Sequence, residues 1–141
     1  MEKLVFQKEI PGISYAFISN NQIERHVIGL KEILPKKIYL KEDTLYDMAS
    51  LTKVICTTTI VLQLIEQELI KIDNPINDYL PEFLDNQVTI RDLLTHTSDI
   101  NGFIPNRDQL NQKELKQAIL ELKSGENRGK IVKYTDTGTI L

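Results

Sequence analysis

The chain has 141 residues, of which 41% are hydrophobic and 26% charged, a composition that fits one globular domain and excludes wholesale disorder and collagen-like repeats. The net charge is −3 and no Lys/Arg run exceeds two residues, so we expect no nucleic-acid partner and no anionic-membrane surface. The single cysteine, Cys56, excludes an internal disulfide and a cysteine-based zinc site, and two histidines are too few for a His-rich metal centre. We therefore expect no metal and no other cofactor.

No stretch of the sequence has the length and composition of a membrane span. The longest uncharged run, residues 54–65, is too short to cross a bilayer and is typical of a buried helix. The first residues lack the apolar core of a signal peptide. If Met1 is the true start, these features favour a cytoplasmic protein.

The first third of the chain is expected to form strands. Residues 13–18 and 22–28 flank Ser19-Asn-Asn, and because asparagine tolerates left-handed backbone angles, a tight hairpin is predicted. Residues 30–42 contain a proline and several lysines, which indicates an exposed loop.

A helix is predicted next, over residues 49–69. Its middle is apolar nearly all round, which indicates that other elements enclose it. The apolar residues are Val54, Ile55, Ile60, Val61, Leu62, Leu64 and Ile65. Cys56 lies in the same stretch, and we expect it to be a small core residue.

Short helical segments are predicted in the rest of the chain. Residues 73–75 can start a helical turn with proline at its first position. Residues 89–92 resemble a capping box that begins a short helix reaching Leu94. Residues 111–114 begin another, with Gly125 as its stop. Residues 131–134 are expected to be extended or loop, and 137–141 open a further element.

Ser50 and Lys53 are the first residues that could carry chemistry. A serine hydroxyl is a weak nucleophile and needs a nearby base. Residues three apart share a face of a helix, so the Lys53 side chain can reach Ser50. Because Lys53 borders an apolar helix, desolvation is expected to lower its pKa. The plain alternative is a helix-start serine beside a solvated lysine.

Four segments that follow one another along the chain carry a family resemblance. They are residues 43–53 (DTLYDMASLTK), 72–83 (IDNPINDYLPEF), 88–98 (VTIRDLLTHTS) and 134–138 (YTDTG). In this order they resemble the serine β-lactamase and penicillin-recognising hydrolase family. The resemblance points to its class C-like branch, which includes D-amino-acid peptidases and β-lactamase-like esterases, and runs from about residue 11 to residue 141.

The resemblance implies a role for each matching residue. Ser50 matches the nucleophile that forms an acyl-enzyme, and its backbone N–H matches one half of the oxyanion hole. Lys53 matches the lysine that helps to take the serine proton. Tyr134 matches the tyrosine that transfers protons to the serine and the leaving group. His96 and Ser98 match a structural motif, in which we expect His96 to be fully hydrogen-bonded.

Three residues depart from the family pattern. Asp136 replaces the usual asparagine and is expected to be a substrate-binding residue; an ionised carboxylate can only accept hydrogen bonds, so recognition of an amide side chain is in question. Glu68 and Asp99 replace glycines that would adopt left-handed backbone angles. Family domains are also well over twice this length, and their third motif, Lys-Thr-Gly or His-x-Gly, is absent from these residues.

The sequence therefore predicts an α/β (α+β) chain with an incomplete β-lactamase/transpeptidase-like fold. Residues 1–141 would supply the N-terminal β-hairpin of the central antiparallel sheet and much of the helical region of a single domain. The predicted function is that of a serine hydrolase acting through Ser50 on a small ester, amide or peptide-like substrate, with this fragment alone inactive. The alternative is a non-catalytic remnant or pseudoenzyme that acts by binding. The oligomeric state is not predicted.

Overall fold

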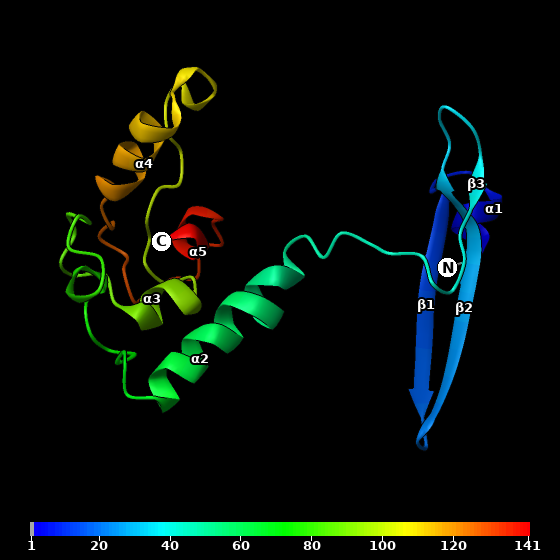
Figure 1. Ribbon diagram of the computed structural model, residues 1–141, viewed down its shortest axis with the longest axis horizontal. Helices are drawn as coiled ribbons and strands as arrows, with labels where there is room; N and C mark the ends of the chain where they lie inside the picture. The colour runs from blue at the N-terminus through cyan, green and yellow to red at the C-terminus, as the bar shows by residue number, and fades with distance from the viewer. Residues whose placement is uncertain (1) are drawn as a thin grey trace. The chain divides into compact units, whose positions relative to one another are not determined.

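The computed structural model describes residues 2–141 and divides the chain into two compact units, residues 1–47 and 48–141 (Figure 1). The first unit holds a short helix and a three-stranded antiparallel sheet with the strand order β1-β2-β3. Its elements are α1 (Glu2–Phe6), β1 (Gly12–Ser19), β2 (Gln22–Glu32) and β3 (Ile38–Tyr39). The fold is thus mixed, with strands in this unit and helices in the next.

The predicted hairpin is confirmed. Strands β1 and β2 pair from Gly12 opposite Gly29 to Ser19 opposite Gln22. Asn20 and Asn21 form the two-residue connection, and both have positive φ angles, of 48° and 60°. Such angles match the twist of the flanking strands, which is why asparagine suits this turn.

The prediction of a loop over residues 30–42 is wrong in part. Strand β2 continues to Glu32, and β3 pairs back on it with Leu30 opposite Tyr39. The pairing has a register shift between Leu30 and Glu32 and covers only two residues of β3, so no alternating pattern reveals it in the sequence. Helix α1 was not predicted from the sequence.

The second unit is helical. It contains a π-helical segment, two 3₁₀ turns and four α-helices. These are η1 (Lys53–Thr58), α2 (Thr59–Glu66), η2 (Ile76–Asp78), α3 (Ile90–Leu94), η3 (Arg107–Gln109), α4 (Gln112–Leu120) and α5 (Thr137–Ile140). Segments η1 and α2 together form the helix predicted over residues 49–69, with shorter bounds at both ends.

The π-helical segment is stabilised by its own threonines. The Thr58 hydroxyl donates to the Lys53 carbonyl at 2.8 Å, and the Thr59 hydroxyl donates to the Val54 carbonyl at 3.4 Å. These bonds satisfy carbonyl groups in a turn that is wider than an α-helical one. Single π-helical turns inside α-helices often occur at functional sites.

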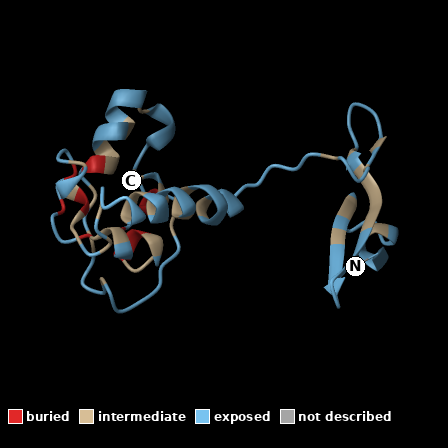
Figure 2. Ribbon diagram, turned by 60° about the horizontal axis from the view of Figure 1, so that its bottom comes forward, coloured by how far each residue is buried: buried red, intermediate tan, exposed pale blue. Residues whose placement is uncertain are grey.

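The expectation that this helix is enclosed is wrong within its unit. Val54 is 64% exposed and Leu62 54% exposed, and Cys56 is also exposed instead of lying in a core. Figure 2 shows exposed residues along much of this helix. The core of the unit lies around the later segments. It consists of Ile76, Phe83, Val88, Leu93, Ile100 and Leu120. The unit therefore covers only one side of the helix, and the apolar residues of the other side remain at its surface.

The predicted capping box at residues 89–92 and the predicted helix start at residues 111–114 are both confirmed. The Thr89 hydroxyl accepts from the Asp92 backbone N–H while the Asp92 carboxylate accepts from the Thr89 backbone N–H. Asn111 and Glu114 make the same reciprocal pair at the start of α4. Helix α4 ends at Leu120, so the predicted stop at Gly125 is wrong.

Candidate active site

Ser50 lies in the tight turn that leads into the π-helical segment. The Leu51 N–H donates to the Met48 carbonyl at 2.9 Å, and the Lys53 N–H donates to the Ser50 carbonyl at 3.1 Å. Ala49, directly before the serine, has a φ of 43°, a left-handed angle that costs a non-glycine residue roughly 1–2 kcal/mol. Strain of this kind is typical of functional turns, and here it accompanies an exposed serine.

Three side chains from two parts of the chain meet at the Ser50 hydroxyl. Lys53 Nζ donates to Ser50 Oγ at 3.3 Å, as the three-residue spacing predicted. The Tyr134 hydroxyl lies 2.8 Å from the same oxygen, although 84 residues separate the two along the chain. Lys53 Nζ also lies 5.2 Å from the centre of the Tyr134 ring. The structure thus brings all three predicted catalytic residues together.

Asp136 belongs to the same cluster. Its Oδ1 lies 2.7 Å from Lys53 Nζ, and the Lys53 side chain is only 18% exposed while that of Asp136 is 73% exposed. Sequence reasoning proposed Asp136 as a substrate-binding residue but did not foresee this ion pair. The signal was present in the sequence, because Asp136 is two residues after Tyr134, and side chains two apart in an extended segment lie on the same face.

The predicted fall in the pKa of Lys53 is wrong. Hydrogen bonding to Asp136, followed by that to Tyr134, raises the Lys53 pKa above its ordinary value, and these effects outweigh desolvation, which lowers it. The prediction considered the apolar helix but not the acid that pairs with the lysine. Lys53 is therefore an ammonium ion at neutral pH.

The charge on Lys53 acts on its two other neighbours. Hydrogen bonding with Lys53, and then with Ser50, lowers the pKa of Tyr134 below its ordinary value, although burial and Asp136 oppose the change. Lys53 also lowers the pKa of Asp136, so that carboxyl group is ionised at neutral pH. Of these side chains, Tyr134 is the one whose pKa moves toward the value that a general base needs.

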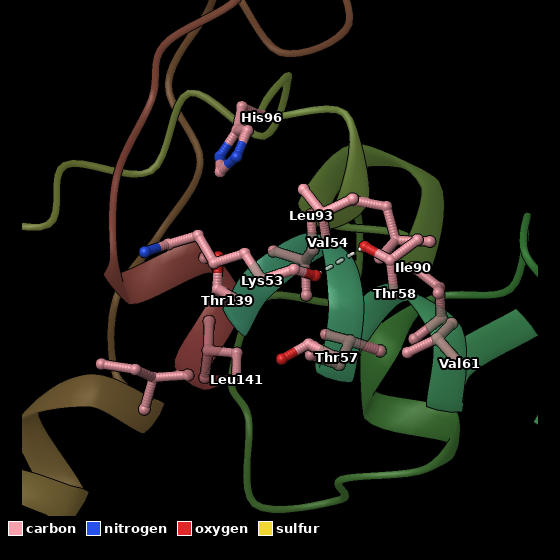
Figure 3. Close-up of a pocket in the computed structure, with 14 residues that line it drawn as sticks. Lys53, Val54, Thr57, Thr58, Val61, Ile90, Leu93, His96, Thr139 and Leu141 are labelled. Atoms are coloured by element: carbon pink, nitrogen blue, oxygen red, sulfur yellow. Dashed lines mark hydrogen bonds between the residues drawn. The ribbon is translucent and has the colours of Figure 1, made fainter. Parts of the chain in front are cut away.

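A pocket of about 240 Å³ extends from Lys53 between the helix, α3 and α5 (Figure 3). Its lining is mainly apolar, with Val54, Leu93 and Leu141 among the residues. Figure 3 also shows Lys53 and His96, which carry side-chain nitrogen atoms, and the hydroxyl groups of Thr57, Thr58 and Thr139. Ser50 and Tyr134 are not among its lining residues, so the pocket reaches the cluster only through Lys53.

His96 differs from its expected role. Its Nδ1 is buried and has no hydrogen-bond partner among the described residues, so the expectation of a fully hydrogen-bonded histidine is wrong. Its ring lies against Tyr134 with the ring centres 4.6 Å apart. His96 has a φ of 57°, which turns the chain and places the ring beside the tyrosine. Sequence reasoning missed this contact, because nothing in the spacing relates residue 96 to residue 134.

The described residues, 2–141, contain no group of three or more His, Cys, Asp or Glu side chains that could hold a metal ion. Within the same residues, no helix combines the length and the apolar character needed to cross a membrane.

The fold, together with the cluster of Ser50, Lys53 and Tyr134, is typical of a serine hydrolase family. The family model described as Beta-lactamase matches residues 1–141, and the chain belongs to this family. The resemblance found in the sequence is therefore confirmed.

Relatives with different activities share this segment. A beta-lactamase of Providencia stuartii is 30% identical over 109 residues, which cover 74% of this chain and 28% of the relative. The acyltransferase calJ of Penicillium decumbens is 36% identical over 98 residues, covering 57% of this chain and 23% of that protein. The esterase EstB of Burkholderia gladioli is 40% identical over 72 residues, covering 46% and 18%.

Solved structures of class C beta-lactamases have the same fold. One matches with a TM-score of 0.81 and 24% identity over 97% of this chain and 38% of its own. Another, in complex with cefoxitin, matches with a TM-score of 0.81 and 25% identity over 97% and 39%. The chain thus spans well under half the length of these relatives and forms part of the β-lactamase fold.

Proposed function

We propose that the protein is a serine hydrolase that transfers an acyl group from a small ester or amide to Ser50 and then to water. The observation that carries this proposal is the meeting of Lys53 and Tyr134 at the Ser50 hydroxyl, at 3.3 and 2.8 Å. The Tyr134 distance is within the range for proton transfer to or from the serine, and the Lys53 distance places its charge beside both oxygens. We also propose that residues 1–141 are the N-terminal portion of a single β-lactamase-related domain.

In the acylation step, Tyr134 acts as the general base in its phenolate form. Ser50 Oγ forms a bond to the substrate carbonyl carbon while its proton passes to the Tyr134 oxygen. Lys53 remains an ammonium ion, because Asp136 raises its pKa, and its charge stabilises the phenolate before the transfer. The carbonyl oxygen becomes an oxyanion, for which the Ser50 backbone N–H is one donor.

The leaving group then departs with the proton held by Tyr134. The tetrahedral carbon loses its bond to the alcohol oxygen or amine nitrogen, and Tyr134 protonates that atom. A water molecule attacks the resulting ester of Ser50 and gives one proton to the Tyr134 phenolate. When the bond to Ser50 Oγ breaks, that proton returns to Ser50, and the free acid leaves.

Asp136 favours neutral esters over anionic substrates. Its exposed carboxylate pairs with Lys53, which contacts the nucleophile, and repels a negatively charged substrate. It also cannot donate a hydrogen bond to an amide carbonyl of the substrate, as an asparagine could. The esterase EstB and the acyltransferase calJ, which share this segment, are named for ester and acyl chemistry.

A fluorophosphonate probe, applied to the protein expressed from its natural gene, tests the proposal. The probe should label Ser50, and Ser50→Ala should abolish labelling, since the reagent needs an activated serine. Ser19→Ala, an exposed serine of the hairpin, is the matched control and should label normally. Labelling of Ser98, or of no residue in a folded protein, would contradict the proposal and favour the non-catalytic alternative.

A further inference from the structure

Asp99 is a carboxylate buried at a position where the family resemblance predicts glycine. Its backbone has a φ of 52°, which confirms the left-handed conformation expected there. Its side chain is only 10% exposed. A buried carboxylate loses hydration and stays stable only if hydrogen bonds or charges replace it. The groups that surround Asp99 therefore indicate what it does.

Within residues 2–141, the groups that hydrogen-bond to the Asp99 carboxylate come from one loop, residues 125–134. The Asn127 backbone N–H donates to Oδ2 at 3.1 Å, and Lys133 Nζ donates to Oδ1 at 3.4 Å. The Asp99 carbonyl also accepts from the Gly125 N–H at 3.2 Å. One aspartate thus holds the beginning, the middle and the end of this loop.

Gly125 is fitted to this carboxylate. A Cβ atom at residue 125 would lie 2.7 Å from Asp99 Cγ and still closer to its Oδ2. No side chain can therefore be added there without displacing the carboxylate. The φ of Gly125 is not in the left-handed region, so the need for glycine comes from the close approach of Asp99.

The loop held by Asp99 ends at Tyr134. Two backbone bonds continue the attachment: the Gly129 N–H donates to the Thr97 carbonyl at 2.8 Å, and the Lys133 N–H donates to the His96 carbonyl at 2.8 Å. Tyr134 follows Lys133 directly, and its hydroxyl lies 2.8 Å from Ser50 Oγ. The position of the Asp99 carboxylate is therefore transmitted to the phenol oxygen through a short, hydrogen-bonded stretch of backbone.

We propose that Asp99 is a positioning residue, whose carboxylate holds the 125–134 loop and thereby aligns Tyr134 with Ser50. This inference rests on the proposed function, because alignment matters only if Tyr134 transfers the serine proton. The positioning role explains why aspartate stands where the family resemblance predicts glycine. The left-handed angle is retained, and the added carboxylate fixes a loop that backbone bonds alone would hold less firmly.

Asp99→Gly and Glu68→Gly form a matched pair for the test. Glu68 also replaces a family glycine, has a φ of 57°, and none of the hydrogen bonds or ion pairs found in residues 2–141 involves its carboxylate. Both substitutions relieve a left-handed backbone, but only Asp99→Gly removes carboxylate contacts with the loop. Acylation by a neutral p-nitrophenyl ester should slow by about tenfold or more in Asp99→Gly, with KM unchanged, since misplacement of a reacting group by about 1 Å can cost up to 10²-fold. Glu68→Gly should react like the native protein.

One further measurement and one further variant separate a positioning role from a loss of folding. Amide hydrogen exchange at Asn127 and Lys133 should accelerate in Asp99→Gly while exchange in α4 is unchanged, and this readout does not depend on activity. Asp99→Asn should be intermediate, because an amide oxygen can still accept from the Asn127 N–H but no longer pairs with the charge of Lys133.

Gly125→Ala and Asp99→Gly together form a double-mutant cycle that tests the same contact. Its methyl group should displace the Asp99 carboxylate and slow acylation in the native background, and its effect should shrink in the Asp99→Gly background. If native protein is active but Asp99→Gly matches it in acylation rate and in exchange at Asn127 and Lys133, the positioning role is wrong and the proposed function stands. If folded native protein forms no acyl-enzyme, the proposed function is wrong and the positioning role fails with it.

Discussion

The ammonium group of Lys53 and the carboxylate of Asp136 form an ion pair, with Nζ 2.7 Å from Oδ1. This pair decides which side chain can serve as the base. Because Asp136 stabilises the charged form of Lys53, the lysine holds its proton and cannot readily take one from Ser50. In the proposed mechanism Tyr134, whose pKa Lys53 lowers, is then the proton acceptor for the serine.

Lys53→Ala should slow acylation by roughly 10²-fold, the scale of losing a positioned acid–base group. Lys53 lowers the Tyr134 pKa, so its removal raises that pKa and leaves less phenolate at any given pH. The acidic limb of the rate profile should therefore move to higher pH. Acylation rates measured across pH test both effects, with Lys113→Ala, an exposed lysine on α4, as the control. An unchanged profile would contradict the assignment.

The sequence predicted much of this site because its signals are local. Ser50 and Lys53 are three residues apart, so helix geometry alone brings them together, and the structure confirms the contact. The Asn20-Asn21 turn and both capping boxes are also set by neighbouring residues. The meeting of Tyr134 with Ser50 was predicted only through the family resemblance, since no local rule relates residues so far apart.

The errors came from contacts made in three dimensions. The Lys53 pKa was predicted from the apolar helix, but the Asp136 carboxylate outweighs that environment. Cys56 was placed in the core because its helix is apolar on all sides, but only one side of that helix faces its unit. The unpartnered Nδ1 of His96 also depends on packing that the sequence pattern does not contain.

Asp136→Asn should change both substrate preference and pH dependence. The negative charge of Asp136 raises the Tyr134 pKa, so its removal should lower that pKa and shift the acidic limb of acylation to lower pH. An amide at this position can also donate to a substrate carbonyl. The rate on a chromogenic cephalosporin, relative to that on a p-nitrophenyl ester, should therefore rise.

The native protein should turn over the neutral ester faster than the cephalosporin. Asp108→Asn, which removes a 97% exposed carboxylate outside the cluster, is the control and should preserve the native ratio. Efficient cephalosporin turnover without esterase activity in the native protein would refute the role given to Asp136.

Glu68→Gly should stabilise the protein by up to about 1 kcal/mol, because a non-glycine residue with left-handed angles is strained by roughly 1–2 kcal/mol and the gain in unfolded-state freedom offsets part of the relief. Urea unfolding measures the change. Glu66→Gly is the contrasting control, since Glu66 ends α2 with helical geometry and glycine there should destabilise by up to about 1 kcal/mol. Equal effects of the two substitutions would show that strain at Glu68 is unimportant.

The buried Asp92 carboxylate links α3 to the loop that carries Tyr134, because its Oδ2 lies 2.9 Å from Arg128 and 3.1 Å from the Thr89 N–H. Burial raises the Asp92 pKa, but hydrogen bonds from Thr89 and Arg128 outweigh it and hold the pKa below its ordinary value of 3.8. The folded state therefore binds fewer protons, and this contribution to stability is present above that value and is lost as the pH falls through the folded pKa.

Asp92→Asn should lower the free energy of unfolding at pH 7 by about 2–3 kcal/mol, the scale of a lost hydrogen bond to a charged group together with an unpaired arginine. The cost should shrink in acid, because below pH 3.8 the carboxyl group of the unfolded chain becomes protonated and its charge contributes less to folding. Urea unfolding at pH 7 and at about pH 3 measures the difference. Some acid sensitivity should remain, since hydrogen bonds from Ser124 and Gln87 outweigh burial and lower the Asp85 pKa too. Asp108→Asn should be neutral at both pH values, because its carboxylate is almost fully exposed. A cost that is the same at both pH values would show that Asp92 stabilises the fold by its shape and not by its charge.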